Sequence, residues 1–479
     1  MISIRATLFF VGLLWAVVAQ PAPTHRYMVG IDPQLTSLRV RACFDGAPPP
    51  ALVAASRHAP YFVDTGSGED DPKRLPLEGV PRDGCISYRV DVAGMAILGQ
   101  LTLGSWIGSD LIVAPEVWLW RPQNDNAEIM LRFELPPGIA VSAPWHPLKN
   151  GAYRVGHAPA HWPASVAFGR LEEREIKVPG AALRLAVLDA MPPANVEEIQ
   201  TWIEGAARAV TGLYGHFPVD AAQVLVIPQA EGDGPVPYGH VMRGGLGAVR
   251  FFIDQQRPLR EFLADWTAIH EFAHLALPLV RRGGAWLSEG VASYYQEVLR
   301  ARNGRLSAQE AWQQLHEGFE RGEQASGEAT LLEASANIYR DSAYSRVYWS
   351  GAAIALLADV QLRKLSHGKS LDSALERLAR CCQPWDHAWS ARALMDRFDD
   401  LTGTSVFTAL YREHVTSTDF PDLTAAYSDL GLEVRGNEIA LKPAPYAHLR
   451  EAIMHRAQPA RLSVETRLRA IKSALMNGR

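Results

Sequence analysis

Hydrophobic and polar residues alternate in short runs between residue 20 and about residue 165, which is typical of β-strands with one buried face. The clearest runs are Leu38–Cys43, Cys85–Val92 and Glu128–Leu135, and turns rich in proline and glycine separate them. Short strands joined by such turns favour antiparallel pairing. We therefore predict an N-terminal antiparallel β domain over residues 20–165.

The spacing of the hydrophobic residues changes from about residue 183 onward. Asn195 and Glu198 have the spacing of a helix cap, and the apolar residues after them recur with a helical period. Strand-like runs lie on both sides of this helix, at Leu183–Leu188, Gln223–Ile227 and Ala248–Ile253. Strands and helices therefore both contribute to a second domain, which we place at residues 180–303.

Two further helices are predicted in the second half of that domain. The first runs from about Leu259 to Leu277 and stops at Pro278, because proline does not continue a helix. The second runs from Trp286 to Arg300 and ends at the pair Asn303-Gly304.

The chain from residue 304 to residue 435 is predicted to be a helical domain. Ser307 and Glu310 have the spacing of a capping box, and Ser342–Leu365 has the pattern of a long helix. Residues 436–479 form a short C-terminal tail with one amphipathic helix after Pro459. The predicted fold class is therefore α+β and multidomain.

The first residues have the pattern of a signal peptide. Arg5 precedes an apolar run over residues 6–19, which is short for a membrane-spanning helix but suits the hydrophobic core of a signal sequence. Small residues favour cleavage after Ala19. We expect export to the periplasm or the extracellular space, and the alternative is an uncleaved N-terminal anchor. No other run is long and apolar enough to span a bilayer.

Composition narrows the function classes. A chain of 479 residues with 48% hydrophobic and 21% charged residues is globular and long enough for two or three domains. Its net charge of -5, without a basic run, gives no reason to expect a nucleic-acid partner. Cys43 and Cys85 could pair in an oxidising compartment, whereas the adjacent Cys381 and Cys382 are expected to be free buried thiols. None has zinc-finger spacing.

A candidate metal site lies in the first of the two predicted helices. His270-Glu271-Phe272-Ala273-His274 has the pattern H-E-x-x-H. Histidines four positions apart stand one helical turn apart, so both imidazoles reach one ion, and the Glu271 carboxylate can act as the general base. Zinc suits this set because two histidines, a carboxylate and one open position form its catalytic arrangement. The alternative is a chance match on an amphipathic helix.

Glu289 is the candidate third ligand. It lies near the start of the second helix, and a helix, a loop of this length and a second helix can fold back on themselves. That arrangement returns Glu289 to the open side of the histidine pair, so one zinc ion is predicted at His270, His274 and Glu289. The alternative is a solvated carboxylate that the helix dipole favours at a helix start.

These residues resemble the gluzincin branch of metallopeptidases, and in particular the glycyl aminopeptidase family. The resemblance rests on H-E-x-x-H and on a W-x-x-E-G-x-x-x-Y-Y-like helix at residues 286–295, and it extends to the segments 347–359, 370–372, 407–415 and 430–432. It covers roughly residues 180–435. It implies a thermolysin-like α/β catalytic domain and a peptide or protein substrate.

The resemblance also implies a catalytic role for Tyr348. A tyrosine at this place in related enzymes donates a hydrogen bond to the oxyanion of the tetrahedral intermediate, charge that develops only on the way to the transition state. The alternative is a core tyrosine, because the neighbouring residues Val347 and Trp349 are apolar. His240 could also reach the cleft, although an isolated histidine in a loop specifies little.

The sequence departs from the family at three places. The family has a glutamate after a Gly-Gly-Leu segment, where it binds the free amino group of a substrate, but here Gly247 follows Gly244, Gly245 and Leu246. The family often carries a C-terminal PDZ domain, for which the tail is too short. The interval between His274 and Glu289 is also short, which implies a trimmed connecting loop.

The predicted function is therefore zinc-dependent hydrolysis of peptide bonds by zinc-activated water with Glu271 as general base and Tyr348 at the oxyanion. The backbone of Gly244, Gly245 and Leu246 would bind an extended substrate. Aminopeptidase and endopeptidase specificity both stay open, and so does the oligomeric state. One alternative is a non-catalytic peptide-binding protein on the same zinc scaffold, and another is zinc-assisted hydrolysis of a non-peptide bond.

Overall fold

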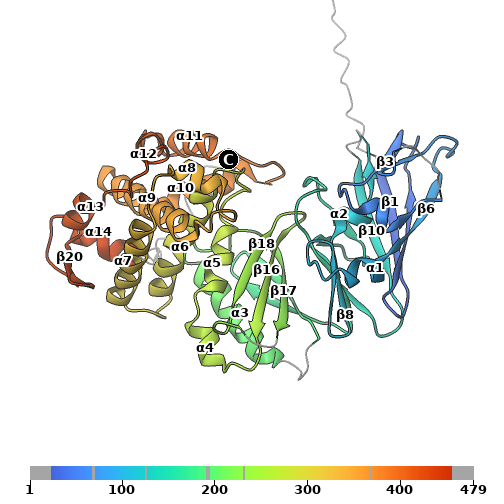
Figure 1. Ribbon diagram of the computed structural model, residues 1–479, viewed down its shortest axis with the longest axis horizontal. Helices are drawn as coiled ribbons and strands as arrows, with labels where there is room; N and C mark the ends of the chain where they lie inside the picture. The colour runs from blue at the N-terminus through green and yellow to red at the C-terminus, as the bar shows by residue number, and fades with distance from the viewer. Residues whose placement is uncertain are drawn as a thin grey trace, which may run out of the picture.

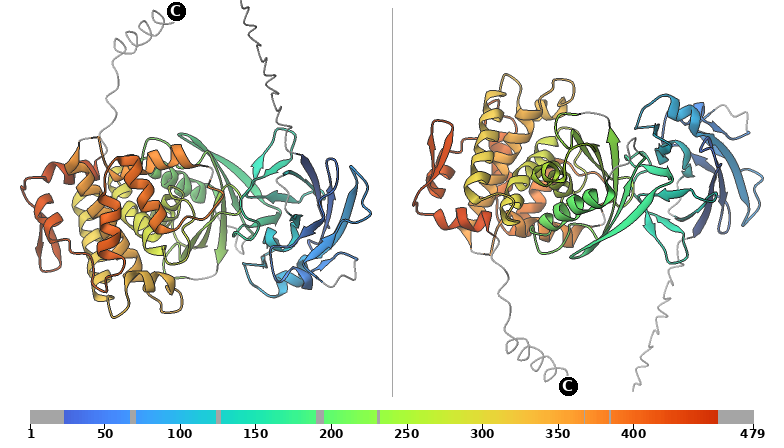
Figure 2. Two further views of the ribbon diagram at one scale, coloured as in Figure 1. Left: turned by 90° about the horizontal axis from the view of Figure 1, so that it is seen from above. Right: turned by 90° about the horizontal axis from the view of Figure 1, so that it is seen from below.

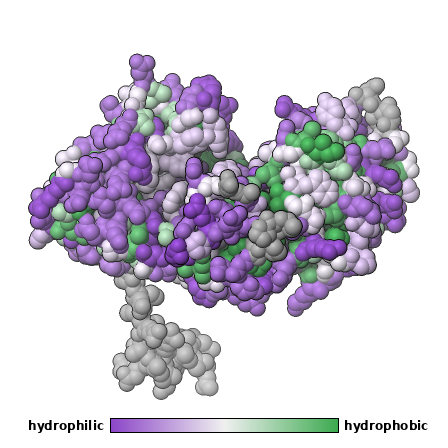
Figure 3. Space-filling model, turned by 60° about the horizontal axis from the view of Figure 1, so that its bottom comes forward, coloured by the Kyte–Doolittle hydropathy of each residue, from purple (hydrophilic) through white to green (hydrophobic). Residues whose placement is uncertain are grey.

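The computed structural model describes residues 23–66, 71–123, 127–189, 195–229, 232–366, 368–383 and 385–455. The predicted signal peptide and the predicted helix after Pro459 lie outside these ranges. The N-terminal strands, a central five-stranded sheet and a helical half follow one another along the long axis of the molecule (Figures 1 and 2). On the face drawn in Figure 3, the helical half is mostly hydrophilic, whereas apolar side chains gather over the N-terminal strands.

Three sheets make up the N-terminal region. Their strand orders are β12-β13-β10-β1-β2-β6-β4, β11-β14-β8-β7 and β5-β3-β9. Their bounds are Thr24–Ile31 (β1), Ser37–Cys43 (β2), Ala51–Val53 (β3), Val63–Asp64 (β4), Arg74–Pro76 (β5), Cys85–Asp91 (β6), Gly104–Ile107 (β7), Asp110–Val113 (β8), Arg121–Pro122 (β9), Glu128–Glu134 (β10), Ala140–Ser142 (β11), His146–Pro147 (β12), Tyr153–Val155 (β13) and Val166–Gly169 (β14).

The three strands predicted in this region are present as β2, β6 and β10. The pairing is antiparallel with one exception, since β1 and β10 pair in parallel from Thr24 opposite Glu128 onward. The long excursion between these two strands contains the short helices α1 (Val92–Ile97) and α2 (Pro115–Trp118) and allows β10 to return in the direction of β1. A purely antiparallel β domain is therefore not what the chain forms.

Both cysteine pairs form disulfides. Cys43 and Cys85 lie opposite each other on β2 and β6 and form the bond that the sequence left open. Cys381 and Cys382 also bond to each other, so the prediction of free buried thiols is wrong. The pair lies at the last turn of α10 (Leu371–Cys382), where Cys381 is exposed rather than enclosed by the core.

The central sheet has the order β15-β16-β17-β19-β18. Its bounds are Glu172–Val178 (β15), Ala181–Val187 (β16), Ala221–Gln229 (β17), Tyr238–Met242 (β18) and Gly247–Asp254 (β19). β16, β17 and β19 run parallel, and β15 and β18 are antiparallel to their neighbours. The helix α3 (Val196–Val210) follows β16, and its Asn195 cap accepts the N–H of Glu198 as predicted. β18 is an outer strand.

Alternate residues of the parallel strands point to opposite faces of this sheet. Val224 and Phe251 belong to the core shared with the helices, whereas Leu225 and Phe252 pack against Ile112 and other residues of the N-terminal region. The sheet is therefore buried on both faces, which explains its continuous apolar runs.

The helix predicted over residues 259–277 is two helices. α4 (Leu259–Ala264) ends at Asp265, which has an extended backbone, and α5 (Thr267–His274) begins two residues later. The Asp265 carboxylate accepts the N–H of Thr267 at 2.7 Å, and this local bond competes with a continuous helix. The prediction of a single unbroken helix is therefore wrong, but the H-E-x-x-H residues still lie on one helix.

The helical half follows α5. Its bounds are Ala285–Arg302 (α6), Ala308–Gln324 (α7), Leu331–Ala336 (α8), Tyr344–Leu365 (α9), Leu371–Cys382 (α10), Ala391–Thr402 (α11), Val406–His414 (α12), Thr424–Leu430 (α13) and Ala447–Met454 (α14), with a hairpin of Leu432–Arg435 (β20) and Glu438–Leu441 (β21). The predicted capping box of Ser307 and Glu310 is present. No helix in the described ranges is both long and apolar enough to span a membrane.

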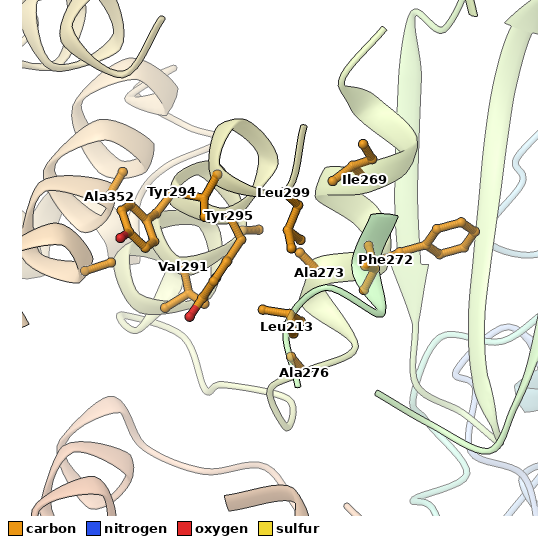
Figure 4. Packing of buried hydrophobic residues seen from close by; sticks show 14 of the residues in the cluster. Leu213, Ile269, Phe272, Ala273, Ala276, Val291, Tyr294, Tyr295, Leu299 and Ala352 are labelled. Atoms are coloured by element: carbon orange, nitrogen blue, oxygen red, sulfur yellow. The ribbon is translucent and has the colours of Figure 1, made fainter. Parts of the chain in front are cut away.

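Close packing joins α5, α6 and α9. Phe272 of α5 points toward the sheet, Ile269 lies in the same core, and Val291 and Tyr295 of α6 lie in the adjoining layer (Figure 4). α6 and α9 approach so closely at Gly290 and Gly351 that a Cβ added to either glycine would overlap the backbone of the other helix. Glu289 on α6 and Tyr348 on α9 stand within a turn of this contact.

The segment predicted as a tail is partly a packed element. Arg450 on α14 donates hydrogen bonds to the carbonyl oxygens of Leu430, Gly431 and Lys442, at 2.9, 3.2 and 2.9 Å. These bonds fix residues up to 455 against the end of the helical half.

Candidate metal centre

α5 brings the two predicted histidine ligands together. The Nε2 atoms of His270 and His274 are 3.2 Å apart, and both side chains are buried. Both rings therefore present the same nitrogen to one point, as a shared ion requires.

Glu289 closes the third side of this arrangement from α6. Its Oε2 atom is 3.3 Å from Nε2 of His270 and 3.3 Å from Nε2 of His274. Ligand atoms at about 2.0–2.1 Å from a tetrahedral zinc ion are separated by roughly 3.3 Å, so the triangle has the size that zinc needs. The three side chains fit one zinc ion, and 22% of the Glu289 side chain is exposed, which leaves one side open toward solvent.

A second set of hydrogen bonds holds the imidazoles. Nδ1 of His270 is 2.9 Å from Oε1 of Gln296, and Nδ1 of His274 is 3.1 Å from Oγ of Ser288. The Gln296 amide in turn donates to Glu297 at 2.8 Å. Acceptors at Nδ1 leave Nε2 free for the metal and fix each ring. We did not predict Gln296 or Ser288, although both lie on α6, seven residues after and one residue before Glu289.

Glu271 lies beside the ligand triangle. One of its carboxylate oxygens is within 4.8 Å of imidazole nitrogens of His270 and His274, and the side chain is buried. A Cβ added at Gly239 would overlap its side chain, so glycine on β18 makes room for this carboxylate. Burial raises the pKa of Glu271, against the opposing effect of the two histidines. A carboxylate with a raised pKa is a better proton acceptor.

Tyr348 reaches the same centre from α9. Its ring stacks on that of His270, with centroids 5.8 Å apart and planes at 13°. Burial raises the pKa of the Tyr348 phenol well above its usual value, and the carboxylates of Glu289 and Glu271 raise it further. The phenol therefore stays protonated and is a hydrogen-bond donor beside the metal position.

His274, Glu289, Glu271 and Tyr348 line a cavity of about 860 Å³. One wall is β18, whose unpaired edge borders the cavity through Tyr238 to Val241. The opposite wall consists of the loop at residues 278–283 and of residues 335–340, which are the end of α8 and the loop after it; we call this the loop wall. Four tyrosines line the cavity, namely Tyr238, Tyr339, Tyr344 and Tyr348.

The structure places the predicted substrate-binding segment elsewhere. The N–H groups of Gly244 and Leu246 donate to the carbonyl oxygens of Pro163 and Pro144, at 2.8 and 2.7 Å. Gly245 is equally close to the N-terminal region, because an added Cβ would overlap the Pro144 carbonyl. These backbone groups contact the N-terminal region and are not available to a substrate, so the prediction for Gly244, Gly245 and Leu246 is wrong.

Gly247 also lies in a different place from the one that the family resemblance implied. A Cβ at this position would lie 3.1 Å from Leu275 and 3.2 Å from Val219, so it would point into the core between them. The edge of the cavity is six to nine residues earlier, on β18. A missing carboxylate at Gly247 therefore says nothing about how a substrate amine is bound.

His240 lies on β18 and lines the cavity, as we considered from the sequence. Its ring stacks on Tyr238, with centroids 6.2 Å apart. Burial lowers the pKa of His240 to about 4, and the positive charges of Arg250 and His274 act in the same direction. The ring is therefore neutral at neutral pH.

Comparisons with known proteins agree with this geometry. Residues 280–354, which include Glu289 and Tyr348, match the model of the M61 glycyl aminopeptidase family. The chain resembles the gluzincin metallopeptidases. The match to the glycyl aminopeptidase family covers α6, the second metal-site helix, and the first half of α9. A search of curated protein sequences finds no match.

Solved structures share the gluzincin-like architecture along most of the chain. An aminopeptidase N family protein from Idiomarina loihiensis has a TM-score of 0.64 at 14% identity, over 86% of this chain and 79% of that chain. An M1 zinc metallopeptidase from Deinococcus radiodurans has a TM-score of 0.51 at 16% identity, over 84% and 94%. Native yeast LTA4 hydrolase has a TM-score of 0.50 at 11% identity, over 85% and 70%. At these identities the likeness shows the fold, and with the family match it supports a zinc metallopeptidase.

Proposed function

We propose that the protein is a zinc-dependent peptidase that hydrolyses peptide bonds in the cavity between β18 and α5. The observation that carries this proposal is the triangle of His270, His274 and Glu289 ligand atoms, with sides of 3.2–3.3 Å and a glutamate beside it. A structural zinc site has four protein ligands, whereas a catalytic site has three and an adjacent base.

Glu271 is the proposed general base. Bound zinc would polarise the scissile carbonyl and acidify water. The Glu271 carboxylate accepts a proton from the attacking water and then delivers it to the leaving amine nitrogen. Its enclosure by Gly239 holds the carboxylate in place for both transfers.

Tyr348 and β18 are the proposed oxyanion and substrate contacts. The Tyr348 hydroxyl donates to the oxygen that becomes negative when water adds to the carbonyl, and a donor of this kind acts most strongly in a site that excludes water. The free edge of β18 offers backbone N–H and C=O groups to an extended peptide, which would add to the sheet as a sixth strand.

Metal analysis combined with peptide hydrolysis tests the proposal. Glu271→Gln should retain zinc and lose hydrolysis, whereas His274→Ala should lose both, because only the second change removes a ligand. Glu261→Gln, on the neighbouring α4 and outside the cavity lining, is the matched control and should keep both. Full hydrolysis by Glu271→Gln would show that the base is misassigned.

The alternative of a non-catalytic peptide-binding protein rested on the absence of a cleft glutamate at Gly247. Because that position faces the core, the absence no longer favours the alternative. A zinc site that only held the fold together would also not place the Glu271 carboxylate beside the ligand triangle.

We further propose that the chain is exported with cleavage after Ala19. The apolar run over residues 6–19 supports this proposal, and so do the Cys43–Cys85 and Cys381–Cys382 disulfides, because disulfides persist in oxidising compartments. N-terminal sequencing of the exported protein should find Gln20 first. A protein that keeps Met1 would contradict it.

A further inference from the structure

The side chains that line the cavity carry an excess of positive charge when the metal ligands and the general base are left out. Among the described residues that line it, the carboxylates are those of Glu271 and Glu289, and both have roles at the metal position. The lining also contains four arginines, which are Arg243, Arg281, Arg282 and Arg340. No lining carboxylate is left to bind the ammonium group of a free peptide N-terminus.

Arg243 is a half-buried cation directly after β18. Its Nη2 donates to the carbonyl oxygen of His274 at 2.6 Å, and its guanidinium carbon lies 5.9 Å from the centre of the Trp385 ring. Its Nε is enclosed and has no hydrogen-bond partner among the described residues. None of the described carboxylates forms an ion pair with Arg243, so an entering carboxylate would give its guanidinium an anionic partner.

Arg281 and Arg282 add exposed positive charge to the opposite wall. Their Nε atoms donate to the carbonyl oxygens of Ala388 and Ala336, at 3.0 and 2.8 Å. These bonds fix the side chains and leave the terminal guanidinium nitrogens able to donate to a ligand. Neither forms an ion pair with a residue that the structure describes. Arg340 differs, because Asp341 neutralises it at 2.7 Å.

We propose that Arg243, Arg281 and Arg282 bind a carboxylate of the substrate, so that the protein selects peptides with an anionic group rather than a free N-terminus. This inference rests on the proposed peptidase function and names its substrate class. A guanidinium suits a carboxylate because its planar fork donates two parallel hydrogen bonds. The carboxylate comes either from an Asp or Glu side chain or from the C-terminus of a short peptide.

A set of matched peptides separates these sources. The neutral parent is N-acetylated and C-amidated, the second peptide carries Glu in place of one Gln, the third keeps Gln but has a free C-terminal carboxylate, and the fourth has a free amine. We expect kcat/KM of the second or third peptide to exceed that of the parent by about tenfold or more. The anionic peptide with the higher kcat/KM identifies the source of the carboxylate. The fourth peptide, which has a free amine, should have no higher kcat/KM than the parent.

Variants link the preference to the arginines. The double variant Arg281→Gln/Arg282→Gln should lower the ratio of kcat/KM for the anionic peptide to kcat/KM for the neutral parent by about tenfold. Arg243→Lys should also lower this ratio, although it keeps the positive charge, because lysine lacks the planar fork of the guanidinium. Arg412→Gln is the matched control, since Arg412 is also exposed and also donates from Nε to a carbonyl, that of Thr408, outside the cavity lining. It should leave the ratio unchanged.

Binding to the Glu271→Gln variant distinguishes the two proposals. Fluorescence anisotropy with the labelled peptides reports recognition without turnover. Tighter binding of the anionic peptides without hydrolysis by the wild-type protein would overturn the peptidase function and support the carboxylate site. Hydrolysis with equal rates for charged and neutral peptides, or a requirement for a free amine, would overturn the carboxylate site and leave the peptidase function standing.

Discussion

On one side of the metal cavity, α5, α6 and α9 present buried and half-buried side chains with second contacts, as His270 has with Gln296 and Tyr348 has by ring stacking. On the other side, the loops at residues 278–283 and 335–340 present exposed side chains such as Arg282 and Tyr339. Helices hold groups more precisely than loops do. Under the proposed function, the helical wall would carry the chemistry, and the loop wall together with Arg243 would carry the selectivity. The following changes test that division.

Tyr348→Phe should have the largest effect on catalysis. The phenyl ring keeps the stacking on His270 but loses the hydroxyl that faces the oxyanion, so kcat should fall by about 10²–10³-fold while bound zinc is unchanged. Steady-state kinetics and metal analysis check this outcome. Tyr344→Phe is the matched control, because Tyr344 lies one turn earlier on α9 and lines the same cavity, yet does not stack on a ligand. An equal loss in both variants would contradict the assignment.

Gly351→Ala tests how the helical wall is held together. The added methyl group would overlap the backbone of Trp286 and Gly290, so α6 and α9 must separate. We expect the free energy of unfolding to fall by about 3 kcal/mol, measured by urea denaturation. Gly327→Ala is the control, because a Cβ there meets nothing within 4 Å. Equal stability of the two variants would show that the close helix contact is not needed.

Gln296→Leu should weaken zinc binding without removing a ligand. The change deletes the acceptor at Nδ1 of His270, and loss of such an outer partner typically costs about 10–100-fold in metal affinity. Competition with a zinc chelator measures the affinity. Gln314→Leu, which removes the acceptor of Arg300 further from the metal, should leave it unchanged. A similar affinity in both variants would argue against the role of Gln296.

His240→Gln should have the smallest effect, on stability at acid pH. The pKa of His240 is about 4 in the folded chain, below the unfolded value of 6.5, so the unfolded chain binds more protons between these values. The free energy of unfolding therefore decreases as the pH falls from 6.5 to 4, because protonation of His240 favours the unfolded chain. In chelator, the wild type should lose about 1–2 kcal/mol more than the variant over this window, by denaturation at each pH. Parallel curves would refute the buried neutral histidine.

The elements and chemistry of the helical wall were predictable because local patterns specify them. H-E-x-x-H fixes two ligands through the pitch of one helix, and Asn195 and Ser307 mark helix starts through bonds to residues three positions away. The break between α4 and α5 was missed, because the side chain of Asp265 overrides an apolar pattern that continues through it.

The wall that β18 forms was not predictable in the same way. Gly244, Gly245 and Leu246 match a family segment in composition, but pairing of β18 with β19 places the cavity edge at residues 238–242 instead. The position of this segment depends on contacts with Pro144 and Pro163, which lie about 80 to 100 residues earlier in the sequence. The arginines of the loop wall are likewise brought together only by the tertiary structure.

The loop wall is fastened by a distant segment of the chain. Val280 forms a β-bridge with Trp389, and Trp389 exchanges backbone hydrogen bonds with Leu279 and Arg281, at 2.9 and 2.8 Å. None of these atoms touches the metal position. Under the proposed function, substitutions around Trp389 would therefore change which peptides are accepted and leave the metal centre unaltered, and a designer seeking new preferences would begin there.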